Sequence, residues 1–237
     1  MKLGVVPDNL IERLALLSGI LPPGIFESWF GIMLARTIMV ATKLEIIEMP
    51  ADRIAKHLSL PRTARQMLDI GGSHGYFSVA ICRRNRQLRS TILDLPEAIK
   101  HAAPLLAKEG LGDRIVHRTG NALTDDLGKG VYDLVFLASV IHHFDEATNR
   151  NLMRRIAQAL RPGGHMANWE PLRQDRAGKI RQIGGLLDLF FGFFSEAGIR
   201  STADVAGWYR EAGLLAQKSW SPRMMPDLAL HVGRKPG

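Results

Sequence analysis

Apolar and polar positions alternate with two different periodicities along most of this chain. From residue 66 onward, short apolar runs typical of buried strands are separated by longer stretches in which apolar residues recur at helical spacing. The pattern predicts strands at 66–71, 89–94, 114–118, 132–137 and 164–170, and helices at 75–86, 96–109, 146–160, 178–196 and 202–212. Strands that alternate with helices predict a parallel sheet with helices on both faces, which is the doubly wound α/β class.

The last part of the chain departs from that alternation. Two strand-like stretches, 214–220 and 227–234, follow each other without a helix between them, and the loop that joins them contains Pro222 and Pro226. Two strands joined in this way form a hairpin, so we expect one edge strand to run antiparallel to the others. The complete prediction is a mostly parallel, seven-stranded, Rossmann-like sheet.

The region before residue 63 shows helical periodicity only. Helices are predicted at 8–20, 25–47 and 51–59. The helix at 25–47 is so apolar that another domain or a second copy of the chain must cover it. We therefore expect a short helical module at 1–62, able to form a homodimer, and an α/β domain at 63–237.

Composition narrows the class of protein. The chain has 237 residues, a single cysteine and a formal net charge of +8. One cysteine excludes a disulfide framework and favours the cytoplasm, and the sequence shows no secretory signal and no run of about 18 apolar residues that would span a membrane. The arginines are spread over several predicted helices without interleaved aromatic residues, which favours solvated helix faces over a nucleic-acid site.

A glycine-rich turn between the first predicted strand and its helix carries the most specific chemistry. Gly71, Gly72 and Gly75 let the backbone turn tightly and approach a ligand, and the helix that follows offers unpaired N–H groups. Asp94 ends the neighbouring strand, where a carboxylate can accept two ribose hydroxyls. Asp69 lies two residues before the first glycine, where its charge would oppose a pyrophosphate and instead suits a cationic ligand.

Three further segments extend this pattern: ILDLPEAI at 92–99, VIHHFDEATNRNLMRRIAQALRPGG at 140–164 and NWEP at 168–171. With the glycine turn, their order and spacing resemble the class I S-adenosylmethionine-dependent methyltransferases, and more narrowly the small-molecule O-methyltransferases of plant and bacterial secondary metabolism. That family carries a larger dimerising N-terminal module, so the module of this chain is abbreviated. The resemblance implies S-adenosyl-L-methionine as the cofactor and S-adenosyl-L-homocysteine as its product.

The resemblance also implies contacts to that cofactor. Asp69 would orient the methionine ammonium, and Asp94 would hold the ribose with Leu95 beside it. Asn121 stands where the family has an aspartate that touches the adenine amino group, and Ala122 would pack beside the ring. Each aspartate also has an alternative, purely structural role. Asp69 could cap the glycine turn, and Asp94 could cap the helix that follows it. The remaining contacts come from the glycine turn and the end of the fourth strand: Gly71, Gly72, Ser73, Gly75, Ala138 and Ser139.

A proton-transfer site is implied by the same resemblance. His142 stands at the position of the family's general base, His143 at the place of an acidic residue, and Glu170 where a glutamate holds the tautomer of the base. His143 is the second choice for the base. The alternatives are that both histidines only pack on the cofactor and that Glu170 pairs with Arg173. No carboxylate cluster in the sequence implies a metal.

The expected reaction is transfer of a methyl group to a hydroxyl of a small aromatic or polyketide-like molecule. An apolar wall for this acceptor is predicted on the helix at 178–196, a pattern equally typical of a core helix, and Trp29 and Met33 would close the same pocket. The wall residues are Leu186, Leu187, Phe190, Phe191, Phe193 and Phe194.

Three other functions fit parts of the pattern. An enzyme of the same fold could methylate nitrogen, carbon or RNA, and an RNA substrate would require a basic strip beside the pocket. A protein of the same fold could hold the cofactor with weak or no turnover, a hypothesis that the departures at Asn121 and His143 favour. A nicotinamide-dependent oxidoreductase is the most distant alternative, and tight binding of NADH would support it.

Overall fold

A computed structural model of the chain describes residues 49–173, 198–223 and 226–237. Its contacts divide the chain into two compact units, Met1–Met49 and Pro50–Gly237. The predicted helices at 8–20, 25–47 and 178–196 lie outside the described residues, as do Trp29, Met33 and the predicted apolar wall. The fold and the site below therefore belong to the second unit.

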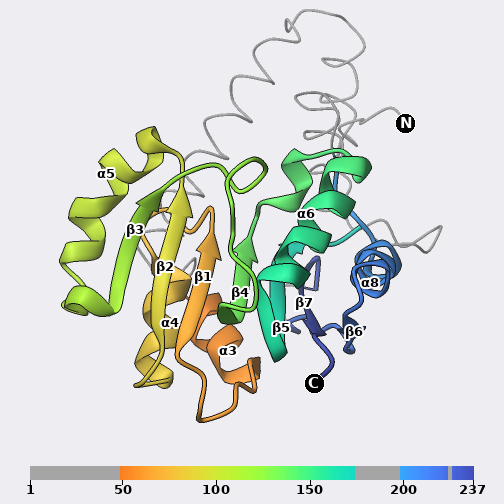
Figure 1. Cartoon of the computed structure of the whole chain (residues 1–237), viewed down its shortest axis with the longest axis horizontal. Helices are drawn as coiled ribbons and strands as arrows, with labels where there is room; N and C mark the ends of the chain where they lie inside the picture. The colour runs from red at the N-terminus through yellow and green to blue at the C-terminus, as the bar shows by residue number, and fades with distance from the viewer. Residues whose placement is uncertain (1–48, 174–197, 224–225) are drawn as a thin grey trace, which may run out of the picture. The chain divides into compact units, whose positions relative to one another are not determined.

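A seven-stranded sheet forms the centre of this unit, in the order β3-β2-β1-β4-β5-β7-β6 (Figure 1). The strands β1 to β5 are parallel, and β7 runs antiparallel to both of its neighbours, β5 and β6. This confirms the predicted mostly parallel sheet with an antiparallel strand near one edge. The strands are β1 (Gln66–Ile70), β2 (Arg89–Asp94), β3 (Ile115–Thr119), β4 (Tyr132–Ala138), β5 (Leu160–Pro171), β6 (Leu215–Ala216) and β7 (Leu228–Arg234).

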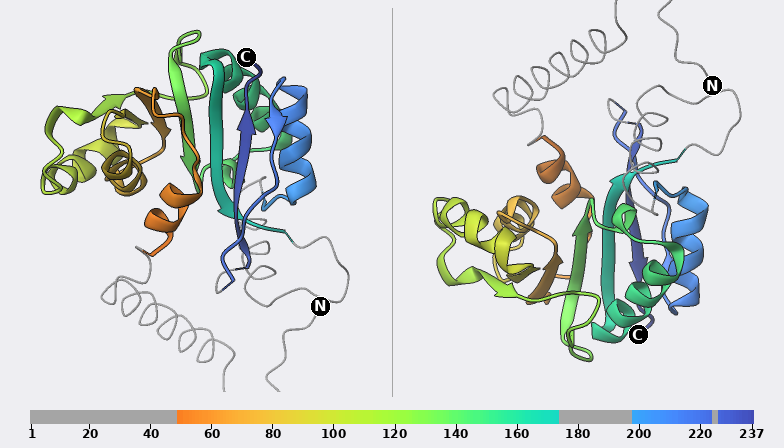
Figure 2. Two further views of the ribbon diagram at one scale, coloured as in Figure 1. Left: turned by 90° about the horizontal axis from the view of Figure 1, so that it is seen from below. Right: turned by 90° about the horizontal axis from the view of Figure 1, so that it is seen from above.

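Helices cover both faces of the sheet, as Figure 2 shows from two directions. One face carries α3, α4 and α5, and the other carries α6 and α8. Because both faces are covered, the central strands are buried on both sides, and the four residues of β4 from Leu134 to Leu137 are all 0% exposed. The helices are α3 (Met49–His57), α4 (Tyr76–Arg84), α5 (Pro96–Ala107), α6 (Glu146–Ala159) and α8 (Thr202–Glu211), and short 3-10 turns η1 (Gly112–Arg114) and η2 (Ile141–His143) connect strands and helices.

Two strands differ from their predictions by more than one residue at an end. The strand β6 has only two residues, Leu215–Ala216, where 214–220 was expected, because the chain pairs with β7 only at its start and again through a single bridge between Trp220 and Leu230. The strand β5 begins at Leu160, before the proline and glycines that were expected to precede it. It is the longest strand and leads directly from α6 to the predicted site at Glu170.

The helix α3 packs within the core of the second unit. Its residues Ala51, Ile54 and Ala55 are at most 2% exposed and belong to the same apolar cluster as α4 and β1. The domain boundary expected between residues 62 and 63 stays a prediction, and the core formed by α3 extends the α/β unit to the N-terminal side of that boundary.

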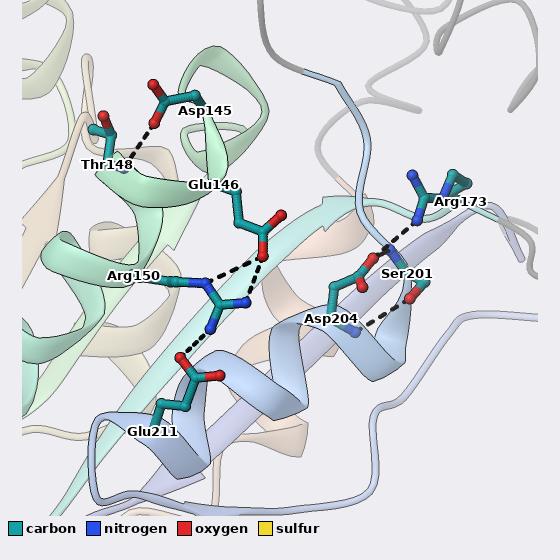
Figure 3. Close-up of polar contacts among 8 residues, drawn as sticks. All are labelled: Asp145, Glu146, Thr148, Arg150, Arg173, Ser201, Asp204 and Glu211. Carbon is teal, nitrogen blue, oxygen red and sulfur yellow. Dashed lines mark hydrogen bonds and ion pairs between the residues drawn. The ribbon is translucent and has the colours of Figure 1, made fainter.

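The helices α6 and α8 are joined at the surface by an arginine (Figure 3). The guanidinium of Arg150 on α6 pairs with Glu146 on the same helix and with Glu211 at the end of α8. At the start of α6, the Asp145 side chain accepts a hydrogen bond from the Thr148 amide at 2.7 Å and caps the helix. The beginning of α6, which directly follows the two predicted catalytic histidines, is thus well defined.

Among the described residues, no helix has the length and apolar character needed to cross a bilayer.

Candidate functional site

The parallel strands end at one edge of the sheet, the edge toward which the arrows of β1 and β2 point in Figure 1. The order of the strands reverses between β1 and β4, and in open α/β sheets such a reversal opens a crevice where ligands bind. The predicted catalytic and cofactor-binding residues all lie at this edge, in the loop after β1, β2, β3 or β4 or at the end of a strand. The loops also contact one another, and together they form a single candidate site.

The glycine loop after β1 requires its glycines. Gly71 and Gly75 have φ of 68° and 80°, in the left-handed region that favours glycine. A Cβ atom on Gly72 would lie 2.5 Å from the Asp69 side chain, so the loop can close over that carboxyl group only with glycine at this position. The predicted close approach of this backbone to a ligand is therefore sterically available.

Ser73 in the same loop also has a positive φ of 48°, which costs energy for a residue with a side chain. Two contacts hold it there. The Ser73 amide donates to Asp94 Oδ2 at 2.9 Å, and the Ser73 carbonyl oxygen lies 2.7 Å from His117 Nε2 on β3. The loop is thus anchored to β2 and β3, and a strained residue held from both sides is typical of a binding loop.

Asp69 is a buried carboxyl group beneath the glycine loop. It is 1% exposed, its Oδ2 accepts a hydrogen bond of 2.6 Å from the Ser78 hydroxyl on α4, and its Oδ1 has no partner. Burial raises the pKa of Asp69 to about 7, the Ser78 hydrogen bond partly opposes this shift, and the charge of Asp94 adds to it. An additional positive group at this edge would stabilise the ionised form of Asp69.

Asp94 lies at the end of β2 with both carboxylate oxygens oriented by backbone amides. Oδ2 accepts from Ser73, and Oδ1 accepts from Leu95 at 2.8 Å. Leu95 is the residue before α5 and no side chain caps that helix through a hydrogen bond, so the contact does not support the capping role that was left open. It also leaves ligand binding possible, because a carboxylate oxygen can accept more than one hydrogen bond. Leu95 itself is 54% exposed.

Asn121 follows β3 and is exposed. Its side-chain oxygen accepts a hydrogen bond of 2.9 Å from the Leu123 amide, which closes a local turn. Ala122 is half-buried, and its carbonyl oxygen accepts from the Arg155 guanidinium. Since the Gly120 amide donates to the Asp94 backbone oxygen at 2.9 Å, this turn is fixed next to the end of β2, where the adenine contacts were predicted.

The end of β4 contacts the glycine loop directly. Ala138 is the last residue of β4, and Ser139 follows it with a positive φ of 57° and donates its amide to the Trp169 carbonyl oxygen at 2.9 Å. A Cβ atom on Gly71 would lie 3.0 Å from the Val140 side chain. The predicted cofactor residues of β1 and β4 are therefore neighbours across the crevice.

His142 and Glu170 form a buried pair. His142 Nδ1 lies 2.7 Å from Glu170 Oε2, and the two residues are 4% and 2% exposed. The other oxygen, Oε1, accepts from the amides of Val140 and Ile141 at 2.6 and 2.9 Å. A carboxylate in this position keeps the proton of His142 on Nδ1, so Nε2 is the basic nitrogen.

The alternative partner for Glu170 is excluded by these contacts. Arg173 donates instead to Asp204 of α8, at 3.1 Å. His143 lies beside His142, with ring centroids 4.2 Å apart and the rings inclined by 49°. Burial and the neighbouring His142 lower the pKa of His143, and the charge of Glu170 partly opposes the shift. His143 is therefore neutral at pH 7 and cannot replace the acidic residue of the family pattern.

Three polar residues of this edge were missed in the sequence, namely Ser78, His117 and Asn149. Ser78 and Asn149 are 0% exposed and lie among apolar neighbours on α4 and α6, so a polar residue on the apolar face of each predicted helix was the available signal. His117 had no comparable signal, because its role depends on β3 lying next to the glycine loop in three dimensions. Among the described residues, no group of three or more histidine, cysteine, aspartate or glutamate side chains could hold a metal ion.

The fold and the site together define a Rossmann-like α/β protein in which a glycine loop, two carboxyl groups and a histidine–glutamate pair lie at one edge of the sheet. A model of the O-methyltransferase domain matches residues 37–214, which is more than half of the chain, and the chain belongs to this family.

Individual relatives cover less of the chain. It is 28% identical over 150 residues to a 3-hydroxy-5-methyl-1-naphthoate 3-O-methyltransferase of Streptomyces sahachiroi, covering 63% of this chain and 43% of the relative. It is 29% identical over 153 residues to an aclacinomycin 10-hydroxylase of Streptomyces purpurascens, covering 63% of this chain and 40% of that protein. The chain thus spans less than half the length of these relatives, and they are not named for one reaction.

A third relative is known in structure. The S-adenosyl-L-methionine-dependent methyl transferase PigF of a Serratia species is 29% identical over 136 residues, covering 57% of this chain and 38% of that protein. The solved structure of PigF with S-adenosylhomocysteine aligns with a TM-score of 0.66 and 27% identity, over 87% of this chain and 62% of that one. The methyltransferase fold and a seven-stranded sheet with one antiparallel strand are therefore shared with proteins of this family.

Proposed function

We propose that this chain is an S-adenosyl-L-methionine-dependent O-methyltransferase that acts on a hydroxyl group of a small aromatic or polyketide-like molecule. The observation that carries the proposal is the buried pair of His142 and Glu170, placed at the same sheet edge as the glycine loop and Asp94. A relative named for methyl transfer to a naphthoate hydroxyl supports the class of acceptor. Methylation at nitrogen, at carbon or on RNA has no comparable support among the described contacts.

The edge fits a cofactor that is positively charged and carries a ribose. The pKa of Asp69 is raised mainly by burial and further by the charge of Asp94, and two carboxyl groups at one edge would repel a pyrophosphate. Asp69 and its unpartnered Oδ1 suit the ammonium group, and Asp94 suits the two ribose hydroxyls. Leu95 and Ala122 offer apolar surface to the adenine, with Asn121 at its edge. When bound, the cofactor supplies a methyl group on a positively charged sulfur atom.

His142 then handles the proton of the acceptor. With Nδ1 donating to Glu170, Nε2 takes the proton from the acceptor hydroxyl as that oxygen becomes the nucleophile. Glu170 stabilises the imidazolium that forms, and its hydrogen bonds from Val140 and Ile141 keep the carboxylate in place. The main contribution of the protein is to align the base and the acceptor beside an already reactive methyl group.

Calorimetric titration with S-adenosylhomocysteine tests the cofactor assignment. We expect micromolar affinity for the whole chain and a loss of at least about tenfold in Asp94→Ala, because one charge-assisted contact contributes this much. Asp113→Ala, which removes an exposed carboxylate at the other end of β3, should bind like the unaltered protein. Equal or tighter binding of NADH would contradict the proposal.

A screen of phenols and hydroxynaphthoates for methyl transfer tests the reaction. We expect His142→Gln to abolish turnover and to leave the affinity for S-adenosylhomocysteine unchanged, and His101→Gln, at an exposed position of α5, to change neither. The relative named as a hydroxylase makes a second outcome informative. Tight cofactor binding without methyl transfer to any acceptor would reject the methyltransferase and retain a cofactor-binding protein.

The assembly and location of the protein belong to the same proposal. The apolar segment at 25–47 is proposed to form a homodimer, and the single cysteine supports the cytoplasm. A monomeric mass in analytical ultracentrifugation at micromolar concentration would contradict the dimer.

A further inference from the structure

The turn that carries His142 is held from one side by Glu170. As described above, Glu170 Oε1 accepts two backbone amides of this turn, those of Val140 and Ile141. These contacts fix the amide groups at the start of the turn. Within the turn, the carbonyl oxygens of Val140 and Ile141 accept the amides of His143 and Phe144 at 3.1 and 3.2 Å. These bonds close the turn on itself, and a donor from another element is needed to stop it from rotating around the Glu170 contacts.

Asn149 holds the same turn from the other side. It is 0% exposed on α6, and its Nδ2 donates to the carbonyl oxygens of Ile141 at 2.9 Å and of Phe144 at 3.0 Å. Side chains on a helix lean toward its N-terminus, so a residue in the first turns of α6 reaches back over the segment that precedes the helix. The cap formed by Asp145 fixes the start of α6 and hence the position from which Asn149 reaches (Figure 3).

The amide group of Asn149 is well suited to hold two carbonyl oxygens at once. An amide NH2 group has two N–H donors on one planar nitrogen and can serve two carbonyl oxygens, whereas a carboxylate would repel both. An apolar side chain would remove this donor from the Phe144 oxygen and leave the Ile141 oxygen with only the Phe144 amide, at 3.2 Å. The opposite amide orientation would place Oδ1 against the same two oxygens. Asn149 Oδ1 has no partner, so this residue carries a buried acceptor that packing alone would not favour beside Leu152 and Met153.

We propose that Asn149 is a positioning residue for the base: together with Glu170 it clamps the turn between Val140 and Phe144, so that the His142 imidazole keeps one orientation toward the acceptor. This inference rests on the proposed function for its consequence in turnover, but the clamp itself is a property of the turn. Removing Asn149 takes one donor from each of two carbonyl groups and lets the His142 ring leave its alignment, and small misplacements of a catalytic group reduce the rate steeply. Cofactor affinity should change little, because the glycine loop and Asp94 are held by separate contacts.

The test replaces Asn149 with leucine, which has nearly the same shape and no donor. The readout is the hydrogen exchange of the His142 Nδ1–H, a resonance identified in the NMR spectrum by its loss in His142→Gln. Removal of two hydrogen bonds should make local opening more frequent, and we expect exchange of this proton to be at least about tenfold faster in Asn149→Leu. Affinity for S-adenosylhomocysteine should stay within about twofold, since no cofactor contact is altered.

The chain offers a matched control. Asn151 lies two residues further along α6, is exposed and makes no hydrogen bond to the turn, so Asn151→Leu should leave the exchange rate unchanged. If Asn149→Leu does not fold, Asn149→Ser retains one donor and should give an intermediate acceleration. An exchange rate equal to that of the unaltered protein in a folded Asn149 variant would overturn the proposal.

Turnover separates this proposal from the assignment of the base. Once an acceptor is found, Asn149→Leu should lower kcat with little change in KM for the cofactor. Faster exchange with unchanged kcat would retain the clamp and reject His142 as the base. Unchanged exchange together with inactivity of His142→Gln would retain the base and reject the clamp.

Discussion

Asp69 is the residue whose surroundings differ most from those of an ordinary aspartate. Its folded pKa is about 7 and the ordinary value is 3.8, so between these pH values the folded protein keeps a proton that the unfolded chain releases. The contribution of Asp69 to stability is therefore fully present below about pH 3.8 and is lost as the pH rises through about 7. We expect Asp69→Asn to remove this dependence, as measured by urea unfolding at several pH values.

A ligand with an ammonium group reverses the preference of Asp69. It stabilises the ionised carboxylate, so affinity for S-adenosylhomocysteine should increase as the pH rises toward 7 and level off above it. A pH-independent affinity in the unaltered protein, or the same dependence in Asp69→Asn, would show that Asp69 does not face the ligand.

Gly72 and Gly207 give opposite expectations for the same substitution. A Cβ atom at Gly72 would meet the buried Asp69 carboxyl group at 2.5 Å, whereas one at Gly207, within α8, has no atom within 4 Å. We expect Gly72→Ala to lower the free energy of unfolding by about 1–3 kcal/mol through overpacking and to weaken ligand binding. Gly207→Ala should raise it by about 0.5–1 kcal/mol, because alanine favours the helix. Chemical denaturation of both variants compares them directly.

At the scale of elements, caps fix where the helices around the site begin. The start of α8 is a capping box in which Asp204 donates its amide to the Ser201 hydroxyl at 3.2 Å and accepts the Ser201 amide at 2.9 Å. We expect Ser201→Ala to lower the free energy of unfolding by about 1 kcal/mol in urea denaturation. Thr202→Ala removes a neighbouring hydroxyl outside the capping box, so an equal loss there would show that the cap is not responsible.

The strands also show where the sequence pattern and the structure differ. The apolar runs predicted β1 and β4 to within one residue, because both strands are buried on both faces and so read as continuous apolar runs. The prediction for β6 was too long because residues 217–219 have a strand-like pattern but lie beyond the ladder with β7. Pairing depends on the position of the partner strand, and no local periodicity reports it.

At the scale of the whole molecule, the sheet and its two helical layers belong to one of the two compact units. The apolar cluster on one face includes α3, so residues 49–237 contain that helix together with all seven strands. We expect a fragment of residues 49–237 to unfold in one cooperative transition with the circular dichroism of an α/β protein. A fragment without a cooperative transition would show that residues 1–48 are required for the fold.

The residues of the candidate site could be predicted from the sequence, but the hydrogen bonds that join them could not. The sequence indicated Asp69 by its place before the glycine turn, Asp94 by its place at a strand end, and Glu170 through the resemblance to the O-methyltransferases. It did not indicate that the Ser73 amide holds Asp94, or that two backbone amides share the second oxygen of Glu170. Those contacts join residues far apart in the chain, and their partners are backbone groups that every sequence contains.

The sequence by itself determined the doubly wound fold, the glycine turn and the identity of the groups that can carry the chemistry, because periodicity, glycine conformation and side-chain type are local properties. Only the tertiary structure decided which nitrogen of His142 is basic, why the pKa of Asp69 is raised, and that Asn149 reaches the turn from behind. Each of these depends on burial and on distances between elements. They arise when the strands and helices pack, since a hydrogen bond or a desolvated charge exists only once its partners are brought together.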